Sequence, residues 1–196
     1  MKPAVRFDTT TQDGDAFQAG YLRVAAALRG AGLGPGEVVA VMLRNEPALL
    51  ELMLAARWIG ARWCPINWHF KAAEVSHILV DSEAKMLVIH ADLVAQIEAG
   101  IPSSVRVFVV EPLPLTRRAY ELPEAWPRPA RPVEGWASFC DAAGGPTPEP
   151  QAPGSAMVYT SGTTGLRKAS VASRPRPSSS PCWPSAAGSR SASRAS

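Results

Sequence analysis

A run of hydroxyl, glycine and lysine residues follows a short apolar segment at 156–159, and these residue types suit phosphate binding. Hydroxyls donate hydrogen bonds to phosphate oxygens, glycines let backbone N–H groups approach an anion, and lysine supplies positive charge. The run is not a Walker A loop, because its last glycine and its lysine are not adjacent and no Ser or Thr follows the lysine. It therefore predicts a phosphate-binding loop, with an ordinary polar surface loop as the alternative. The residues of this loop are Thr160, Ser161, Gly162, Thr163, Thr164, Gly165 and Lys168.

The elements that must position this loop alternate between strand and helix patterns. The apolar runs and periodicities predict strands at 37–43, 62–66, 85–90, 106–110 and 156–159, and helices at 16–31, 45–60, 71–81 and 92–99. In the second helix we expect Asn45 to be the N-cap and Pro47 to lie in the first turn. Strands that alternate with helices run parallel and are joined by crossover connections. The pattern predicts an α/β fold, a partial doubly wound sheet with parallel βαβ units.

Residues 111–154 interrupt this alternation. They contain ten prolines, each of which removes a backbone hydrogen-bond donor. We expect this segment to be a long connection rather than another βα unit. The predicted organisation is therefore a body at 1–170, with a Pro-rich connection inside it, and a separate tail at 171–196.

The basic character of the chain lies in that tail. The 196 residues carry a net charge of +3, from 20 Lys plus Arg and 17 Asp plus Glu. Residues 171–196 hold four arginines and no acidic residue, so residues 1–170 carry a net charge of −1. Serine, alanine and proline make up most of the tail and bury too little apolar surface to offset the loss of chain entropy. We expect the tail to be disordered, and a shifted reading frame is one hypothesis for its composition.

Several other features indicate packing rather than chemistry. The glycines at 30, 32, 34 and 36 follow a predicted helix and lack the G-x-G-x-x-G spacing, so they indicate a helix stop and a turn. The histidines lack metal-ligand spacing and are expected to be solvated or packed, and three tryptophans are expected to pack in the core. These side chains are His69, His77, His90, Trp58, Trp63 and Trp68.

The cysteines and the apolar runs bear on the cellular compartment. The three cysteines, Cys64, Cys140 and Cys182, lie far apart in the sequence, and no two of them have the short spacing of a metal-binding pair. This pattern fits a reducing compartment better than a disulfide framework or a zinc site. The longest apolar run, 38–43, is too short to cross a membrane, and no apolar stretch follows the first residues. We therefore expect a cytoplasmic protein with no transmembrane segment.

The predicted loop closely resembles the signature loop of the adenylate-forming (AMP-binding) superfamily, which contains acyl-CoA synthetases, adenylation domains and luciferases. Residues 159–168, Tyr-Thr-Ser-Gly-Thr-Thr-Gly-Leu-Arg-Lys, carry the resemblance. Residues 32–45 and 60–68 resemble two further motifs of the family, and residues 74–93 look most like its acid–CoA ligases. The resemblance covers about residues 16–170 and implies the N-terminal part of a ligase large domain.

In that family the loop holds the β- and γ-phosphates of ATP while a carboxylate attacks the α-phosphate, and CoA then takes the acyl group. The resemblance implies that the seven loop residues listed above bind ATP. It also implies that Mg²⁺ and CoA take part, and that the substrate is a fatty or related carboxylic acid. It implies no nucleic-acid partner. It assigns no catalytic residue and no metal ligand within this chain, and it leaves the oligomeric state open.

The sequence departs from the family pattern at Arg167, where the family prefers proline, and at Ala169, where it prefers glycine. After Lys168 the resemblance ends, before the expected acyl pocket, the Mg²⁺-coordinating acid and the mobile C-terminal domain. We therefore expect an N-terminal fragment that is inactive by itself. One alternative is a non-catalytic α/β binding module whose basic tail contacts nucleic acid or an anionic membrane. Another is a non-functional truncated product.

Overall fold

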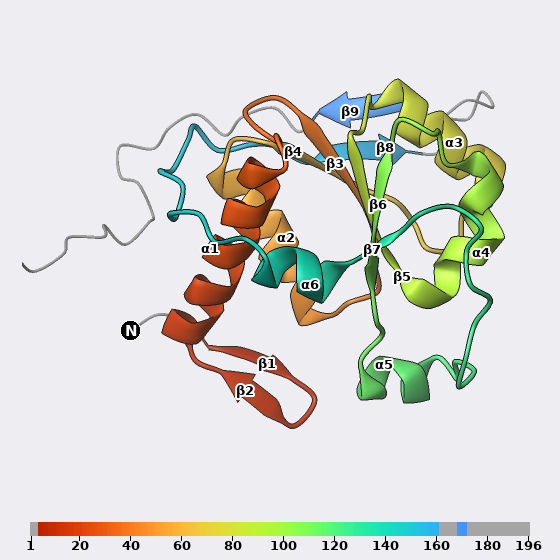
Figure 1. The fold of residues 1–196 in the computed structure, drawn as a ribbon, viewed down its shortest axis with the longest axis horizontal. Coiled ribbons are helices and arrows are strands. Elements are labelled where there is room, and N and C mark those ends of the chain that lie inside the picture. Colours follow the sequence, from red (N-terminus) through yellow and green to blue (C-terminus); the bar gives the residue numbers. More distant parts are fainter. Residues whose placement is uncertain (1–3, 161–167, 172–196) are drawn as a thin grey trace, which may run out of the picture.

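The fold is centred on a five-stranded parallel sheet (Figure 1). The computed structural model describes residues 4–160 and 168–171. Along the sheet the strands follow the order β4-β3-β5-β6-β7. Their bounds are β3 Val38–Met42, β4 Arg62–Pro65, β5 Met86–His90, β6 Arg106–Val110 and β7 Glu134–Gly135. The parallel pairing confirms the predicted α/β class and its βαβ units.

Helices cover both faces of this sheet, which explains why β3 is apolar throughout. One face packs against α1 (Gly14–Gly30), α2 (Pro47–Trp58) and α6 (Trp136–Asp141). The other packs against α3 (Ala72–Asp81) and α4 (Val94–Ile97). In β3, Val39 and Val41 belong to the first core, while Val38, Ala40 and Met42 belong to the second. Side chains alternate between faces, so a strand that is buried on both sides is apolar at successive positions.

The bounds of α1, α2 and α3 lie within two residues of the predicted helices. The differences concern the N-cap of α2 and the helix predicted at 92–99. The first helix, α1, is capped by Asp13, whose Oδ1 accepts from the N–H groups of Asp15 and Ala16 at 2.9 and 2.8 Å. It ends at Gly30, and Gly32 follows with a φ of +86°, which confirms the predicted stop and turn. The helix expected at 92–99 divides into η1 Ala91–Leu93, α4 and η2 Glu98–Gly100.

The predicted cap of α2 was wrong. Its N-cap is Glu46 rather than Asn45, and Pro47 occupies the first helical position. The Glu46 side chain does not cap the helix. Its carboxylate instead faces inward, toward His90 and the N–H of Leu113. Tertiary contacts, rather than capping of the helix, therefore determine the position of the Glu46 side chain.

The Pro-rich segment contains more structure than predicted. It forms α5 (Pro114–Ala119), then β7, which pairs with β6 in parallel, and then α6. Trp136 and Cys140 of α6 are buried in the first core. The prediction that this segment adds no βα unit was therefore wrong. The strand was missed because it is two residues long and its side chains are exposed, so it leaves no apolar pattern.

Two hairpins complete the described fold. Near the N-terminus, β1 (Val5–Phe7) pairs with β2 (Thr10–Gln12). Near the end, β8 (Met157–Thr160) confirms the strand predicted at 156–159 and pairs antiparallel with β9 (Lys168–Val171). Residues 172–196 of the predicted tail lie outside the described residues.

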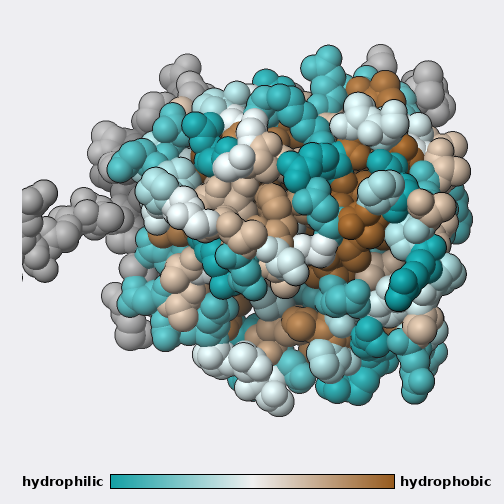
Figure 2. Space-filling model, in the orientation of Figure 1, coloured by the Kyte–Doolittle hydropathy of each residue, from teal (hydrophilic) through white to brown (hydrophobic). Residues whose placement is uncertain are grey.

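The side of the molecule seen in Figure 2 is largely hydrophilic. Hydrophobic residues come to the surface between α4 and the middle of the sheet (Figure 2). Among the described residues, no helix combines the length and the apolar character needed to cross a bilayer.

Candidate functional site

The carboxyl ends of the parallel strands form one edge of the molecule, and the loop after β8 begins at this edge. An isolated parallel bridge joins Ala156 to Trp63, so β8 runs in the same direction as β4. In open α/β sheets, ligands bind in the crevice outside the carboxyl ends of the strands. The predicted loop therefore begins where this fold class binds its ligands.

The two ends of the predicted phosphate loop lie together. Thr160 is the register partner of Lys168, the last residue of β8 facing the first of β9. The hairpin therefore brings the first and last predicted binding residues to the same place on the backbone. The other five, Ser161, Gly162, Thr163, Thr164 and Gly165, lie outside the described residues.

A cleft of about 800 Å³ opens beside the base of this hairpin. Its walls come from the ends of β3 and β4, from α2, and from the segment that follows β4. Tyr159, the residue before the loop, is part of the wall. Most of the residues that line it have apolar or aromatic side chains, and they include Leu43, Met53, Trp63, Trp68, Phe70 and Tyr159.

The tryptophans divide between packing and this cleft. Trp58 and Trp63 are partly buried against the first core, as expected, and the Trp58 Nε1 donates to the Pro148 carbonyl oxygen at 2.8 Å. Trp68 is also partly buried, against the second core, and both Trp63 and Trp68 line the cleft as well. Its ring centroid lies 5.0 Å from the Arg44 guanidinium carbon, and that of Tyr120 lies 4.9 Å away. Both distances allow cation–π attraction.

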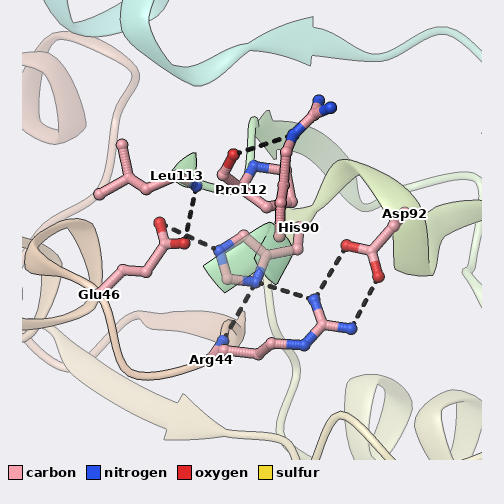
Figure 3. A network of polar contacts seen from close by, with 7 residues as sticks. Arg44, Glu46, His90, Asp92, Pro112 and Leu113 are labelled. Atoms are coloured by element: carbon pink, nitrogen blue, oxygen red, sulfur yellow. Dashed lines mark hydrogen bonds and ion pairs between the residues drawn. The ribbon is translucent and has the colours of Figure 1, made fainter. Parts of the chain in front are cut away.

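A buried polar network lies at the same edge, between the ends of β3 and β5 (Figure 3). Arg44 pairs with Asp92 through two hydrogen bonds, Nη1 to Oδ1 at 2.9 Å and Nη2 to Oδ2 at 2.7 Å. The Arg44 N–H donates to Nδ1 of His90 at 3.1 Å, so Nδ1 acts as an acceptor. The other ring nitrogen, Nε2, lies 3.4 Å from Glu46 Oε2. The His90 side chain is completely buried.

Glu46 connects this network to the Pro-rich segment. Its Oε1 accepts from the Leu113 N–H at 2.9 Å (Figure 3). Burial raises the pKa of Glu46, but hydrogen bonds from His90, Thr116 and the Leu113 N–H outweigh burial and leave that pKa below its ordinary value. Because each charge faces a partner inside the network, we interpret this cluster as structural rather than as a ligand site.

Sequence reasoning missed the network. It expected His90 to be solvated or packed, and His90 is buried, but the partners of His90 were not identified. One pattern could have found them: Arg44 and Glu46 follow the end of β3, and His90 and Asp92 lie at the end of the neighbouring β5. Polar pairs two residues apart at the ends of adjacent buried strands meet at the same sheet edge.

The remaining candidate groups offer neither a nucleophile nor a metal centre in the described part. Burial raises the pKa of Cys64 and of Cys140 to about 12, so both thiols stay protonated at neutral pH. Among residues 4–160 and 168–171, no three His, Cys, Asp or Glu side chains cluster as metal ligands would. The described residues thus offer no such set for the Mg²⁺ that the resemblance implied.

Comparison with known proteins agrees with the loop and the fold. The family described as AMP-binding enzyme matches residues 1–176. The medium/long-chain-fatty-acid–CoA ligase FadD6 of Mycobacterium tuberculosis is 35% identical over 152 residues, 76% of this chain and 23% of that protein. A long-chain-fatty-acid–CoA ligase of Thermus thermophilus is 35% identical over 153 residues, 76% of this chain and 25% of that protein.

Solved structures show the same fold. The anthranilate CoA ligase AuaEII has a TM-score of 0.66 at 20% identity, over 87% of this chain and 31% of that one. A benzoate CoA ligase of Burkholderia xenovorans has a TM-score of 0.65 at 21% identity, over 84% of this chain and 29% of that one. The chain thus spans about a quarter of the length of FadD6 and of the Thermus ligase. By its sequence match over residues 1–176, the chain belongs to the AMP-binding enzyme family.

Proposed function

We propose that this chain is the N-terminal part of an ATP-dependent, AMP-forming acid–CoA ligase and that its loop at 160–168 holds the ATP phosphates. The observation that carries the proposal is the hairpin. It pairs Thr160 with Lys168 at the carboxyl edge of the sheet, beside the cleft. Relatives named as ligases or synthases of fatty-acid-, feruloyl- and indoleacetate-CoA support a carboxylic acid as the substrate class.

The proposed reaction has two steps. A carboxylate oxygen attacks the α-phosphorus of ATP, the bond to the β-phosphate oxygen breaks, and acyl-adenylate and pyrophosphate form. The sulfur of CoA then attacks the acyl carbonyl carbon, AMP leaves with the bonding electrons, and the thiol proton is released. The loop hydroxyls, its N–H groups and Lys168 stabilise the charge that grows on the departing pyrophosphate. A bound Mg²⁺ would neutralise part of the same charge, and we assign it no ligand here.

We further propose that the chain alone binds ATP without completing adenylation. The chain spans only 23% of FadD6 and 29% of the fatty acid–[acyl-carrier-protein] ligase ScoC, so most of each relative has no counterpart here. A carboxylate-dependent ATP–pyrophosphate exchange assay on the full chain should give no exchange. Clear exchange would overturn this part of the proposal.

Titration calorimetry of the full chain with ATP tests the phosphate loop. Replacing Lys168 with alanine should raise the Kd for ATP about 10- to 100-fold, because a hydrogen bond to a charged group contributes about 1.5–3 kcal/mol. The matched control is Lys85→Ala, since Lys85 precedes β5 at the opposite, amino edge of the sheet and pairs with Glu37. Equal weakening by both variants, or no ATP binding by the wild type, would contradict the proposal.

The same preparation can test the alternative of a nucleic-acid binding module. Salt-sensitive binding to nucleic acid that is lost when residues 171–196 are removed would favour that alternative. No described contact favours it over the ligase.

A further inference from the structure

Tyr159 is the last residue before the predicted loop whose side chain the structure describes. Its ring is 8% exposed and packs in the second core, together with Met157 two residues earlier. Val158 points to the other side of β8 and is 38% exposed. The alternation of the strand therefore places Tyr159 inside the fold, one residue before the chain leaves it.

The hydroxyl of Tyr159 reaches the end of α3. It donates a hydrogen bond to Asp81 Oδ2 with an O–O distance of 2.6 Å, which is typical of a hydroxyl bonded to a carboxylate. One turn earlier on the same helix, the His77 ring meets the Tyr159 ring edge-on, with centroids 6.5 Å apart. Residues four apart lie on one helix face, so two side chains of α3 hold the same tyrosine.

In this hydrogen bond the Tyr159 hydroxyl is the donor and the Asp81 carboxylate is the acceptor. Burial first, and then the hydrogen bond to Asp81, raises the pKa of Tyr159 above its ordinary value, so the hydroxyl keeps its proton. Asp81 is the last residue of α3, where the helix dipole disfavours negative charge. A hydroxyl donor at this position offsets that cost.

The amino end of β8 is held separately. There the Trp63 N–H donates to the Ser155 carbonyl oxygen at 3.3 Å, next to the bridge between Trp63 and Ala156. Beyond this bridge, the described part of β8 pairs only with β9. The backbone of β4 thus fixes the start of the strand, and the side chain of Tyr159 links its far end to α3.

We propose that Tyr159 and Asp81 form a positioning pair that fixes the end of β8, and with it the paired backbone of Thr160 and Lys168, against the body of the domain. This inference rests on the proposed function, because it assigns the pair a role in phosphate binding. The pair touches no phosphate. It raises the fraction of molecules in which Thr160 and Lys168 are held in place at this edge, and the apparent Kd depends on the fraction that is competent to bind.

The first test measures binding of ATP and of inorganic pyrophosphate to the full chain by titration calorimetry. Tyr159→Phe and Asp81→Ala should each raise the Kd about tenfold, the effect of losing one hydrogen bond to a charged group. Asp81→Asn should stay within about twofold of the wild type, because the amide oxygen still accepts. Tyr120→Phe is the matched control, since it removes a hydroxyl from a tyrosine outside the pair.

The double variant Tyr159→Phe with Asp81→Ala should bind no more weakly than either single variant, since both remove one interaction. A purely structural role would instead lower the free energy of unfolding and leave the Kd of the folded protein unchanged. That result, or additive effects in the double variant, would overturn the inference.

Hydrogen exchange of the β8 and β9 amides separates this inference from the proposed function. Tyr159→Phe should speed exchange in these strands while the centre of α3 stays protected. If the wild type binds neither ATP nor pyrophosphate, the ligase proposal and the phosphate role of the pair both fail. If the wild type binds but Tyr159→Phe binds equally well with unchanged exchange, the pair alone is disproved.

Discussion

Two polar regions at the carboxyl edge of the sheet are built in opposite ways. In the network at the ends of β3 and β5, Arg44 faces Asp92 and Glu46 faces His90. The loop region from 160 to 171 carries Arg167 and Lys168 and no acidic residue. Removing one partner of a buried pair leaves the other charge uncompensated, whereas a positive run rich in glycine and hydroxyls suits an anion that arrives from solution. The location of a polar region at this edge therefore does not indicate its role. The balance of positive and negative residues within the region is the more informative property.

We expect the largest loss of stability from a substitution of Asp92, in the buried network. Asp92→Ala leaves the Arg44 guanidinium buried without its carboxylate, and breaking a buried pair in this way costs about 3–5 kcal/mol. The side chains of Arg44 and Asp92 are only 4% and 8% exposed, so water cannot replace the lost partner. Urea unfolding measures the loss, while the Kd for ATP of the folded variant should not change.

The control for Asp92→Ala is Glu134→Ala. Arg106 and Glu134 also form a pair with several hydrogen bonds, but their side chains are 46% and 50% exposed. Removing Glu134 should therefore cost less than about 1 kcal/mol. Equal losses in the two variants would contradict the distinction between a buried network and a surface pair.

A second, smaller effect is expected where the chain approaches β8. A Cβ at Gly154 would lie 1.7 Å from the Ala61 carbonyl oxygen, so Gly154→Ala must displace the backbone. Overpacking of this kind costs about 1–3 kcal/mol, and here it should also weaken ATP binding because it shifts the strand that carries the loop. Gly145→Ala is the matched control, since a Cβ there meets nothing within 4 Å. Unchanged unfolding and ATP binding in Gly154→Ala would show that the close approach is not needed.

The smallest effect concerns pH and the Glu46 carboxylate. Its pKa in the folded state lies below the ordinary value of 4.5. A lowered pKa contributes stability above the unfolded pKa and loses it as the pH falls through the folded pKa. The free energy of unfolding of the wild type should therefore fall more steeply in acid than that of Glu46→Gln. Urea unfolding in buffers from neutral to acid measures this, and parallel curves for the two proteins would contradict it.

Much of the fold could be predicted from the sequence, because its central strands are buried on both faces. The strand at 106–110 has the expected bounds, and the inner face of α3 is Val75, Ile78 and Leu79, as its periodicity indicates. Burying side chains of this size contributes about 1.5–3 kcal/mol each, so the pattern dominates local preferences. The weak elements, β7 and the cap of α2, depend on tertiary contacts and were missed.

For the candidate site, the sequence by itself identified the family and predicted a phosphate-binding loop. The order of hydroxyls, glycines and lysine is local, and it needs no partner from elsewhere in the chain to be identified. Only the tertiary structure decided which charges meet. Arg44 and His90 are 46 positions apart in the sequence, and Asp81 and Tyr159 are 78 positions apart, yet the parallel sheet and α3 bring these partners together. A hydrogen bond depends on distances of a few ångströms, and residue types along the chain do not specify those distances.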